Sequence, residues 1–217
     1  MIFTLACVLV KGKGRKYTPD YVARLRRMVA KHTDQPFRTI CLTDQPDAMP
    51  EGVEAVEIPN PYPYRGWWAK MHLFDPLMPF EDRILYLDLD IIVLKDLAAF
   101  LDFPAEFAIA PDSAPNFLGK GRMKAIKAYN SSVMVWDHGV RSRLFTEFDP
   151  WCRRRLWSDQ DAIAEMSPGE KTFPLEWFTR IGPGSFPFPL EKKIGLCTLI
   201  KNHVAVQQFG WFEEFWN

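Results

Sequence analysis

The chain alternates between short continuous apolar runs and segments in which apolar residues recur every three or four positions. Short apolar runs are typical of strands that are buried on both faces, and the wider spacing is typical of helices. Strands are therefore predicted over residues 2–10, 37–42, 53–58, 83–87, 91–94, 107–110 and 131–136. Helices are predicted over residues 21–32, 69–77, 142–155 with a break at Pro150, and 159–166.

This order of elements predicts the fold class. Strands that alternate with helices indicate an α/β fold with a mainly parallel central sheet flanked by helices. At 217 residues the chain is long enough for one domain with a substantial core, so residues 1–217 are expected to form a single domain with an irregular segment from 168 to 217. In open sheets of this kind, ligands bind beyond the carboxyl ends of the strands.

Composition narrows the class of function. Lys plus Arg and Asp plus Glu both number 27, so the basic excess typical of nucleic-acid binders is missing. No apolar stretch reaches the roughly 18 residues of a membrane span, and none of the four cysteines forms a Cys-x-x-Cys pair. These observations predict a soluble cytoplasmic protein in a reducing compartment, with no nucleic-acid partner and no transmembrane segment.

Two aspartates, Asp88 and Asp90, interrupt the apolar run from 84 to 94. A buried carboxylate costs several kcal/mol unless it is paired, protonated or bound to a cation. Residues two apart in a strand point to the same face, so both carboxylates are expected to reach one divalent cation. Mg²⁺ and Mn²⁺ prefer oxygen ligands and can bridge the phosphates of a nucleoside diphosphate. The alternative is a strand end at which both aspartates meet water.

A second acidic group, Asp159, Gln160 and Asp161, opens the predicted helix at 159–166. One interpretation is a helix cap with solvated carboxylates, since Ser158 or Asp159 is placed to cap the helix. The other is catalytic: a carboxylate holds sugar hydroxyls while the amide orients a developing charge.

Four further residues lie before the aspartate pair. Lys70 is either solvated or a point charge for a diphosphate. Trp67 and Trp68 are either core residues or a cover over a nucleotide. Asp44, which follows the strand at 37–42, is either a turn residue or a contact to the base or ribose.

Two candidates lie after the pair. Asn130 begins a strand, where it serves either as a turn residue or as a pocket amide for a sugar hydroxyl. His203 is either structural or a third ligand of the metal, because imidazole also binds Mn²⁺.

Three strings of sequence occur in a characteristic order: ILYLDLDIIV at 84–93, YNSSVMVWD at 129–137 and SDQDAI at 158–163. Together they resemble glycosyltransferases of the GT-A fold, and most of all family eight, which includes glycogenin and bacterial galactosyltransferases of lipopolysaccharide synthesis. A set of short bacterial glycosyltransferase-like proteins also shares the string WWAKMHLF at 67–74. The resemblance covers about residues 1–166.

The resemblance implies a GT-A fold, a nucleotide-sugar donor such as a UDP-sugar, Mn²⁺ or Mg²⁺, and retention of the anomeric configuration. Asp88 would contact the ribose and the metal, and Asp90 the metal. Lys70 would match a basic residue upstream of the aspartate motif. Asn130 and the 159–161 group would line the site for the sugar and for an acceptor glycan, lipid or protein.

The C-terminal segment departs from the family pattern. His203 is not followed by the Gly and the Pro-Lys-Pro or Lys-Pro-Trp string of the family. Three alternatives therefore stay open: weak activity, a site that another chain completes, or loss of activity. Loss would make the chain a sugar-nucleotide or glycan-binding domain without turnover. The alternative enzyme is a nucleotidyltransferase, for which KGKGR at 11–15 is a faint phosphate loop. The aromatic tail at 209–216 is either an interface that joins two copies of the chain or a membrane-surface patch.

Overall fold

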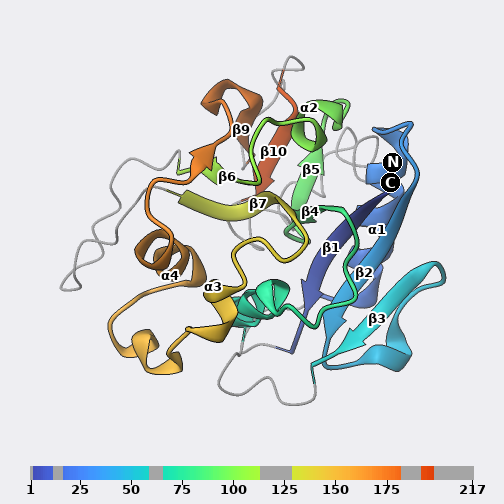
Figure 1. Ribbon diagram of the computed structural model, residues 1–217. Helices are drawn as coiled ribbons and strands as arrows, with labels where there is room; N and C mark the ends of the chain where they lie inside the picture. Colours follow the sequence, from blue (N-terminus) through green and yellow to red (C-terminus); the bar gives the residue numbers. More distant parts are fainter. Residues whose placement is uncertain (1, 12–16, 59–65, 113–128, 182–191, 198–217) are drawn as a thin grey trace.

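A computed structural model of the protein describes residues 2–11, 17–58, 66–112, 129–181 and 192–197 (Figure 1). Its centre is a seven-stranded sheet. The strands, in spatial order, are β3 (Val53–Glu57), β2 (Phe37–Thr43), β1 (Phe3–Leu9), β4 (Arg83–Leu87), β7 (Tyr129–Asp137), β6 (Phe107–Pro111) and β8 (Lys171–Thr172). Neighbouring strands are parallel except at β7, which is antiparallel to both β4 and β6. The predicted α/β class with a mainly parallel sheet is confirmed.

A second sheet of three strands has the order β5 (Ile91–Val93), β10 (Ile194–Cys197) and β9 (Phe178–Ile181). The helices are α1 (Pro19–Lys31), α2 (Ala98–Leu101), α3 (Arg143–Thr146) and α4 (Asp159–Met166). Short 3₁₀ helices are η1 (Pro46–Ala48), η2 (Gly66–Phe74), η3 (Pro150–Arg154) and η4 (Leu175–Trp177). No helix in the described ranges is both long enough and apolar enough to cross a bilayer.

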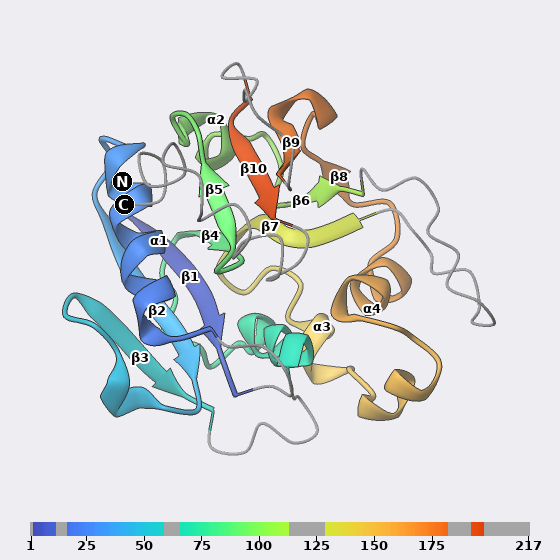
Figure 2. The same cartoon turned by 180° about the vertical axis from the view of Figure 1, so that it is seen from behind.

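The central strands β1 and β4 are buried on both faces, and they divide their side chains between two cores. Leu5 and Leu85 face a core that also contains α1, α2 and the small sheet. Their chain neighbours Ala6 and Ile84 face the core formed with η2, α3 and α4. This alternation follows from the two-residue period of a strand. Figure 2 shows α1 crossing β1 and β2 on one side, and Figure 1 shows η2, α3 and α4 on the other.

Two predictions of local structure were wrong, and one was confirmed. The segment predicted as a helix over 69–77 is the 3₁₀ helix η2, in which six of the nine residues are buried. Residues three apart eclipse one another in a 3₁₀ helix, so Trp68, Met71 and Phe74 lie on one side of it. The predicted break at Pro150 is confirmed: residues 142–155 contain two separate helices, α3 and η3, and Pro150 is the first residue of η3. Proline lacks the N–H that a continuous helix needs.

The C-terminal segment was predicted to be irregular, but within its described part it contains β8, β9 and β10. β10 pairs with β5, about one hundred residues earlier in the chain. Strands this short carry little pattern of their own, so distant pairing partners decide their structure.

Candidate functional site

The two aspartates lie in a turn rather than in a strand. Asp88, Leu89 and Asp90 connect β4 of the large sheet to β5 of the small sheet. The Asp88 N–H donates to the Ser132 carbonyl at 2.9 Å, and the Asp88 carbonyl accepts from the Ile91 N–H at 3.2 Å. The prediction that both side chains point to the same face of one strand was therefore wrong, because the chain passes from one sheet to the other between the two residues.

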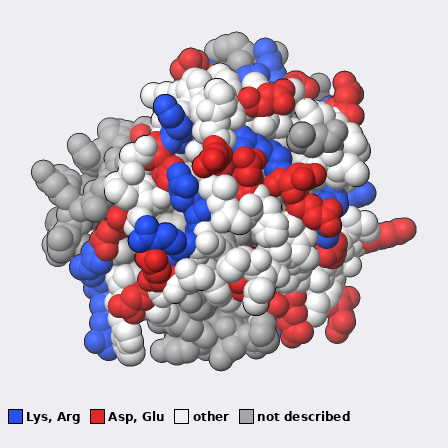
Figure 3. Space-filling model, viewed as in Figure 1, with Lys and Arg blue, Asp and Glu red and all other residues white. Residues whose placement is uncertain are grey.

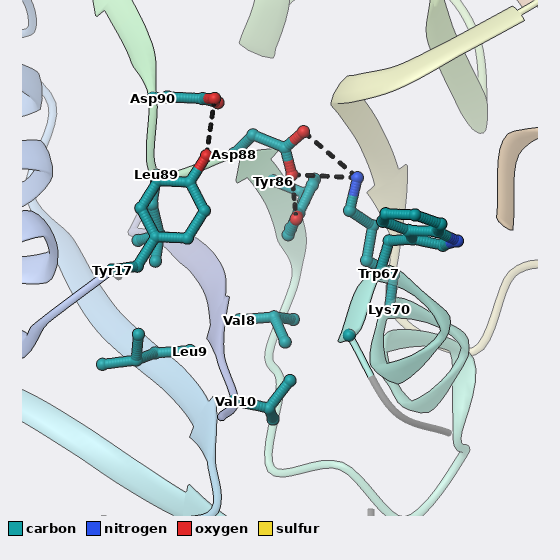
Figure 4. A pocket seen from close by; sticks show the side chains of 11 residues that line it. Val8, Leu9, Val10, Tyr17, Trp67, Lys70, Tyr86, Asp88, Leu89 and Asp90 are labelled. Atoms are coloured by element: carbon teal, nitrogen blue, oxygen red, sulfur yellow. Dashed lines mark hydrogen bonds and ion pairs between the residues drawn. The ribbon is translucent and has the colours of Figure 1, made fainter. Parts of the chain in front are cut away.

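Both aspartates nevertheless line one pocket, a cavity of about 80 Å³. It lies at the carboxyl ends of β1 and β4, where an open α/β sheet binds its ligands. At roughly 10–15 Å³ per water-sized group, this cavity has room for an ion and a few phosphate oxygens. Figure 4 shows Tyr17 and Asp90 on one side, Lys70 and Trp67 on the other, and Asp88 between them.

Lys70 is buried on the η2 side of this pocket. Its ammonium nitrogen lies 2.9 Å from Asp88 Oδ1 and 3.1 Å from Asp88 Oδ2. It also lies 3.5 Å from Asp159 Oδ2 and donates to Ser131 Oγ at 3.2 Å. The phenol hydroxyl of Tyr86 donates to Asp88 Oδ1 at 2.5 Å. A buried ammonium surrounded by two carboxylates is electrically compensated, which satisfies the requirement for a charge in a protein interior.

Ser131 joins the two halves of this cluster. Its hydroxyl donates to Asp159 Oδ2 at 2.6 Å while accepting from Lys70. The pairing of β6 with β7 is interrupted at this point: Ile109 pairs with Met134, but the next residue, Ala110, pairs with Asn130. The bulge takes the intervening residues of β7 out of the β6 ladder, and bulges commonly redirect side chains next to functional sites.

The pKa directions follow from burial and from this cluster. Burial lowers the pKa of Lys70, but the carboxylates of Asp159 and Asp88 raise it by more, so the ammonium stays charged. Burial raises the pKa of Asp88, but the Lys70 charge and the Tyr86 hydrogen bond outweigh it and hold that pKa below its usual value. Burial dominates at Asp159 and raises its pKa despite Lys70 and Ser131. Asp159 therefore takes up a proton more readily than Asp88.

Asp90 has a different environment. Its side chain is on the far side of the turn, 8% of the residue is exposed, and Oδ2 accepts a hydrogen bond from the Tyr17 phenol at 2.7 Å. Both aspartates thus present carboxylate oxygens to one cavity. Oxygen atoms of this kind fit Mn²⁺ or Mg²⁺, which leave further coordination positions to phosphates and water. Among the residues that the structure describes, no three acidic, His or Cys side chains are grouped to hold a metal.

The group at the start of α4 is divided. Asp159 belongs to the Lys70 cluster, whereas Asp161 completes a capping box with Ser158: its Oδ2 accepts from the Ser158 N–H at 3.1 Å and from the Trp157 N–H at 3.2 Å. Gln160 is half-buried beside them. The capping interpretation is therefore confirmed for Asp161, and a catalytic role for Asp159 and Gln160 stays a prediction.

Asn130 and Asp44 both stabilise local backbone. Asn130 Oδ1 accepts from the Ser132 N–H at 2.9 Å, within the bulge of β7. Both carboxylate oxygens of Asp44 accept from the Lys11 N–H, at 3.2 and 3.1 Å, which fixes the chain after β1. Neither residue lines the pocket.

The two tryptophans point in different directions. Trp67 lines the pocket and is 37% exposed. Trp68 is buried, and its ring centre lies 5.7 Å from that of Phe148 in the core. His203 and the aromatic tail at 209–216 lie outside the described residues.

Three residues that donate hydrogen bonds to the carboxylates of this site were not predicted from the sequence: Tyr17, Tyr86 and Ser131. Tyr86 and Ser131 lie within strings that were singled out, but Tyr86 is buried like its neighbours in β4, so the apolar pattern does not distinguish it. The position of Tyr17 depends on how the chain before α1 approaches the turn, which no local pattern specifies.

Solved structures of similar shape include sugar-transferring enzymes. The galactosyltransferase LgtC, solved with donor and acceptor sugar analogues, matches with a TM-score of 0.71 over 98% of this chain and 94% of LgtC, at 14% identity. The fold is that of the GT-A glycosyltransferases. An active-site variant of LgtC, in which a glutamine is replaced by glutamate, matches with a TM-score of 0.62 over 90% of this chain and 87% of LgtC, at 12% identity.

The glycosyltransferase GlyE of Streptococcus pneumoniae TIGR4 matches with a TM-score of 0.55 over 90% of this chain, at 14% identity. The match covers 55% of GlyE, so this chain spans about half of that protein's length. No protein-family model and no curated protein matches the sequence. At these identities the likeness establishes the fold, and activity must be argued from the site.

Proposed function

We propose that the protein is a metal-dependent glycosyltransferase that moves a sugar from a nucleotide-diphosphate sugar, a UDP-sugar, to an acceptor. The observation that carries the proposal is the convergence of Asp88, Asp90 and the buried cation of Lys70 on one pocket at the carboxyl end of the central sheet. The GT-A fold supports it, since the neighbours of similar shape transfer sugars.

Asp88 and Asp90 are the residues that would hold Mn²⁺ or Mg²⁺. When bound, such an ion neutralises charge that develops on the departing diphosphate. Carboxylate oxygens suit these hard cations, and the size of the cavity leaves room for phosphate oxygens beside them.

The other residues of the site, in and next to the pocket, are proposed to act by position and charge. Lys70 is held by Asp88 and Ser131 before any ligand arrives, so its ammonium offers a preorganised charge to a diphosphate. Asp159 and Gln160, at the start of α4, are proposed to hold the sugar. LgtC, a protein of similar shape, also has an active-site glutamine. Trp67 gives the pocket an aromatic wall against which a base or sugar ring can stack.

Retention of the anomeric configuration is proposed by analogy with family eight, and the acceptor is a glycan, lipid or protein hydroxyl. Asn130, Asp44, Asp161 and Trp68 are better explained by the backbone, capping and core contacts described above than by contact with a ligand.

A thermal-shift screen of UDP-sugars with and without Mn²⁺ tests the donor site. A ligand that binds only the folded state raises Tm by an amount that grows with its concentration over Kd. We expect a rise that needs the metal, and we expect Asp90→Ala to remove it. Asp102→Ala, which removes an exposed carboxylate at the end of α2, is the control that should keep the rise in Tm. A screen in which no UDP-sugar raises Tm with Mn²⁺ present contradicts the proposal.

Hydrolysis separates an enzyme from a binding domain. Glycosyltransferases without acceptor are expected to release UDP slowly, by transfer to water. Release of UDP that depends on Mn²⁺ and is lost in Asp90→Ala supports an enzyme. Metal-dependent binding of a UDP-sugar, with no release of UDP whichever acceptor is added, supports a binding domain without turnover.

A further inference from the structure

A second cavity lies outside the proposed donor pocket, between η3 and the C-terminal part of α4. Its volume of about 240 Å³ exceeds the 80 Å³ of the Asp88/Asp90 pocket. At about 10–15 Å³ per water-sized group, it holds roughly sixteen such groups, more than the about twelve non-hydrogen atoms of a hexose. Its apolar lining includes Leu156, Ala162 and Met166.

Trp151 forms one wall of this cavity and is 63% exposed. The guanidinium carbon of Arg154 lies 4.3 Å from the centre of its ring, so one face of the indole is covered by a cation. The backbone N–H of Trp151 donates to Asp149 Oδ1 at 2.8 Å, which fixes the first turn of η3. The tryptophan is thus held in place while most of its surface stays in solvent, an arrangement that favours contact with a ligand.

Two of the acidic residues that line the cavity are paired with arginines. Glu147 forms two hydrogen bonds with Arg143, at 2.9 and 2.8 Å, and Glu165 forms two with Arg155. Figure 3 shows basic and acidic side chains next to one another around α3 and α4. A phosphate or other anion would have to compete with a carboxylate for the guanidinium groups of Arg143 and Arg155.

We propose that this cavity binds a neutral saccharide. A sugar ring has apolar C–H faces, which stack on an indole, and a rim of hydroxyls, which donate to carboxylates and accept from guanidinium groups. The cavity offers a matching set: the Trp151 ring, an apolar lining, and polar groups from Glu147, Asp149 and Arg155. The site is separate from the proposed donor pocket, with which it shares no lining residue, and it does not require that the chain transfer sugar.

The indole N–H signals of Trp151 and Trp157 report binding directly in ¹H–¹⁵N spectra, assigned with Trp→Phe variants. Trp157 is a matched control, since it is 61% exposed but does not line the cavity. We expect titration with lactose, maltose or cellobiose to shift the Trp151 signal and leave the Trp157 signal in place. If none of the three disaccharides shifts the Trp151 signal, the proposal is wrong.

Two variants test whether the saccharide lies in this cavity. Trp151→Ala should weaken saccharide binding at least fivefold, and Met166→Trp, which fills the cavity while keeping Trp151, should weaken it as well. Trp157→Ala should leave it unchanged. An equal loss in Trp157→Ala, or no loss in either cavity variant, overturns the assignment.

Competition distinguishes this site from the donor pocket. Saturation with UDP and Mn²⁺ should leave saccharide binding unchanged, so displacement by UDP would contradict a separate site. Glucose 6-phosphate should not bind here more tightly than maltose, and tighter binding would identify an anion site instead. Failure of the UDP-sugar screen leaves this result untouched, because the two experiments report on different residues.

Discussion

The two sides of the donor pocket differ in the partners of their carboxylates. On the Lys70 side, the ammonium is paired with Asp88 and Asp159, and the hydroxyls of Tyr86 and Ser131 donate to these two carboxylates. On the opposite side, Asp90 accepts a hydrogen bond from the neutral phenol of Tyr17. Because the first side holds buried ion pairs, it is expected to be the more sensitive of the two to substitution.

This difference predicts that the Lys70 side contributes far more to stability. Lys70→Met removes the cation and leaves Asp88 and Asp159 facing each other without compensation. Breaking a buried ion pair in this way costs about 3–5 kcal/mol in the free energy of unfolding. Urea denaturation measures it, with Lys95→Met, an exposed lysine, as the control that stays within about 0.5 kcal/mol. A loss below about 1 kcal/mol would show that Lys70 is not buried as described.

Matched substitutions of Asp88 and Asp90 compare the stability of the two sides most directly. Asp88→Asn should lower the free energy of unfolding by about 2–3 kcal/mol, because it deprives the buried Lys70 of its nearest partner. Asp90→Asn should change it by less than about 1 kcal/mol, since the amide oxygen can still accept from Tyr17. Both variants should lose the Mn²⁺-dependent Tm shift with UDP. Equal stability losses would remove the distinction between the two sides.

Ser131→Ala tests whether the cluster depends on its bridging hydroxyl. Lys70 and Asp159 each lose one hydrogen bond, at an expected cost of about 1–3 kcal/mol. Ser142→Ala is the matched control, because the Ser142 side chain makes no cap hydrogen bond to α3. A Ser131→Ala protein as stable as the control would mean that Lys70 and Asp159 hold each other directly.

Tyr17→Phe is expected to have the smallest effect, about 1 kcal/mol or less. A double-mutant cycle with Asp90→Asn isolates the contact, and the coupling energy should be of the order of 0.5–1 kcal/mol. A coupling energy near that of a buried ion pair would contradict this difference between the two sides.

Long buried segments could be predicted from the sequence because their pattern is local. The apolar runs of β1, β2, β4 and β7 and the spacing in α1 and α4 specify those elements with small errors at their ends. The tight winding of η2 and the strands after residue 170 depend on contacts with distant parts of the chain, which local pattern does not contain.

The candidate site, too, could be predicted from the sequence only in part. Asp88 was selected from the sequence because it interrupts an apolar run, Asp159 because it begins a helix, and Lys70 because it follows two tryptophans before the aspartate motif. The structure brings the three together. Asp161 and Asn130 looked equivalent to them in sequence but bind backbone N–H groups. Residue type alone does not reveal whether a carboxylate or amide faces a cavity or a helix end.

The bulge in β7 has a consequence for how this protein can change. Ser131 and Ser132 lie where β6 and β7 lose their regular pairing, and their carbonyl oxygens accept from Lys70 Nζ and the Asp88 N–H instead. Substitutions at these two serines need not preserve a cross-strand partner on β6. The cost of a substitution at Ser131 therefore falls on the Lys70 cluster rather than on the hydrogen-bond ladder of the sheet.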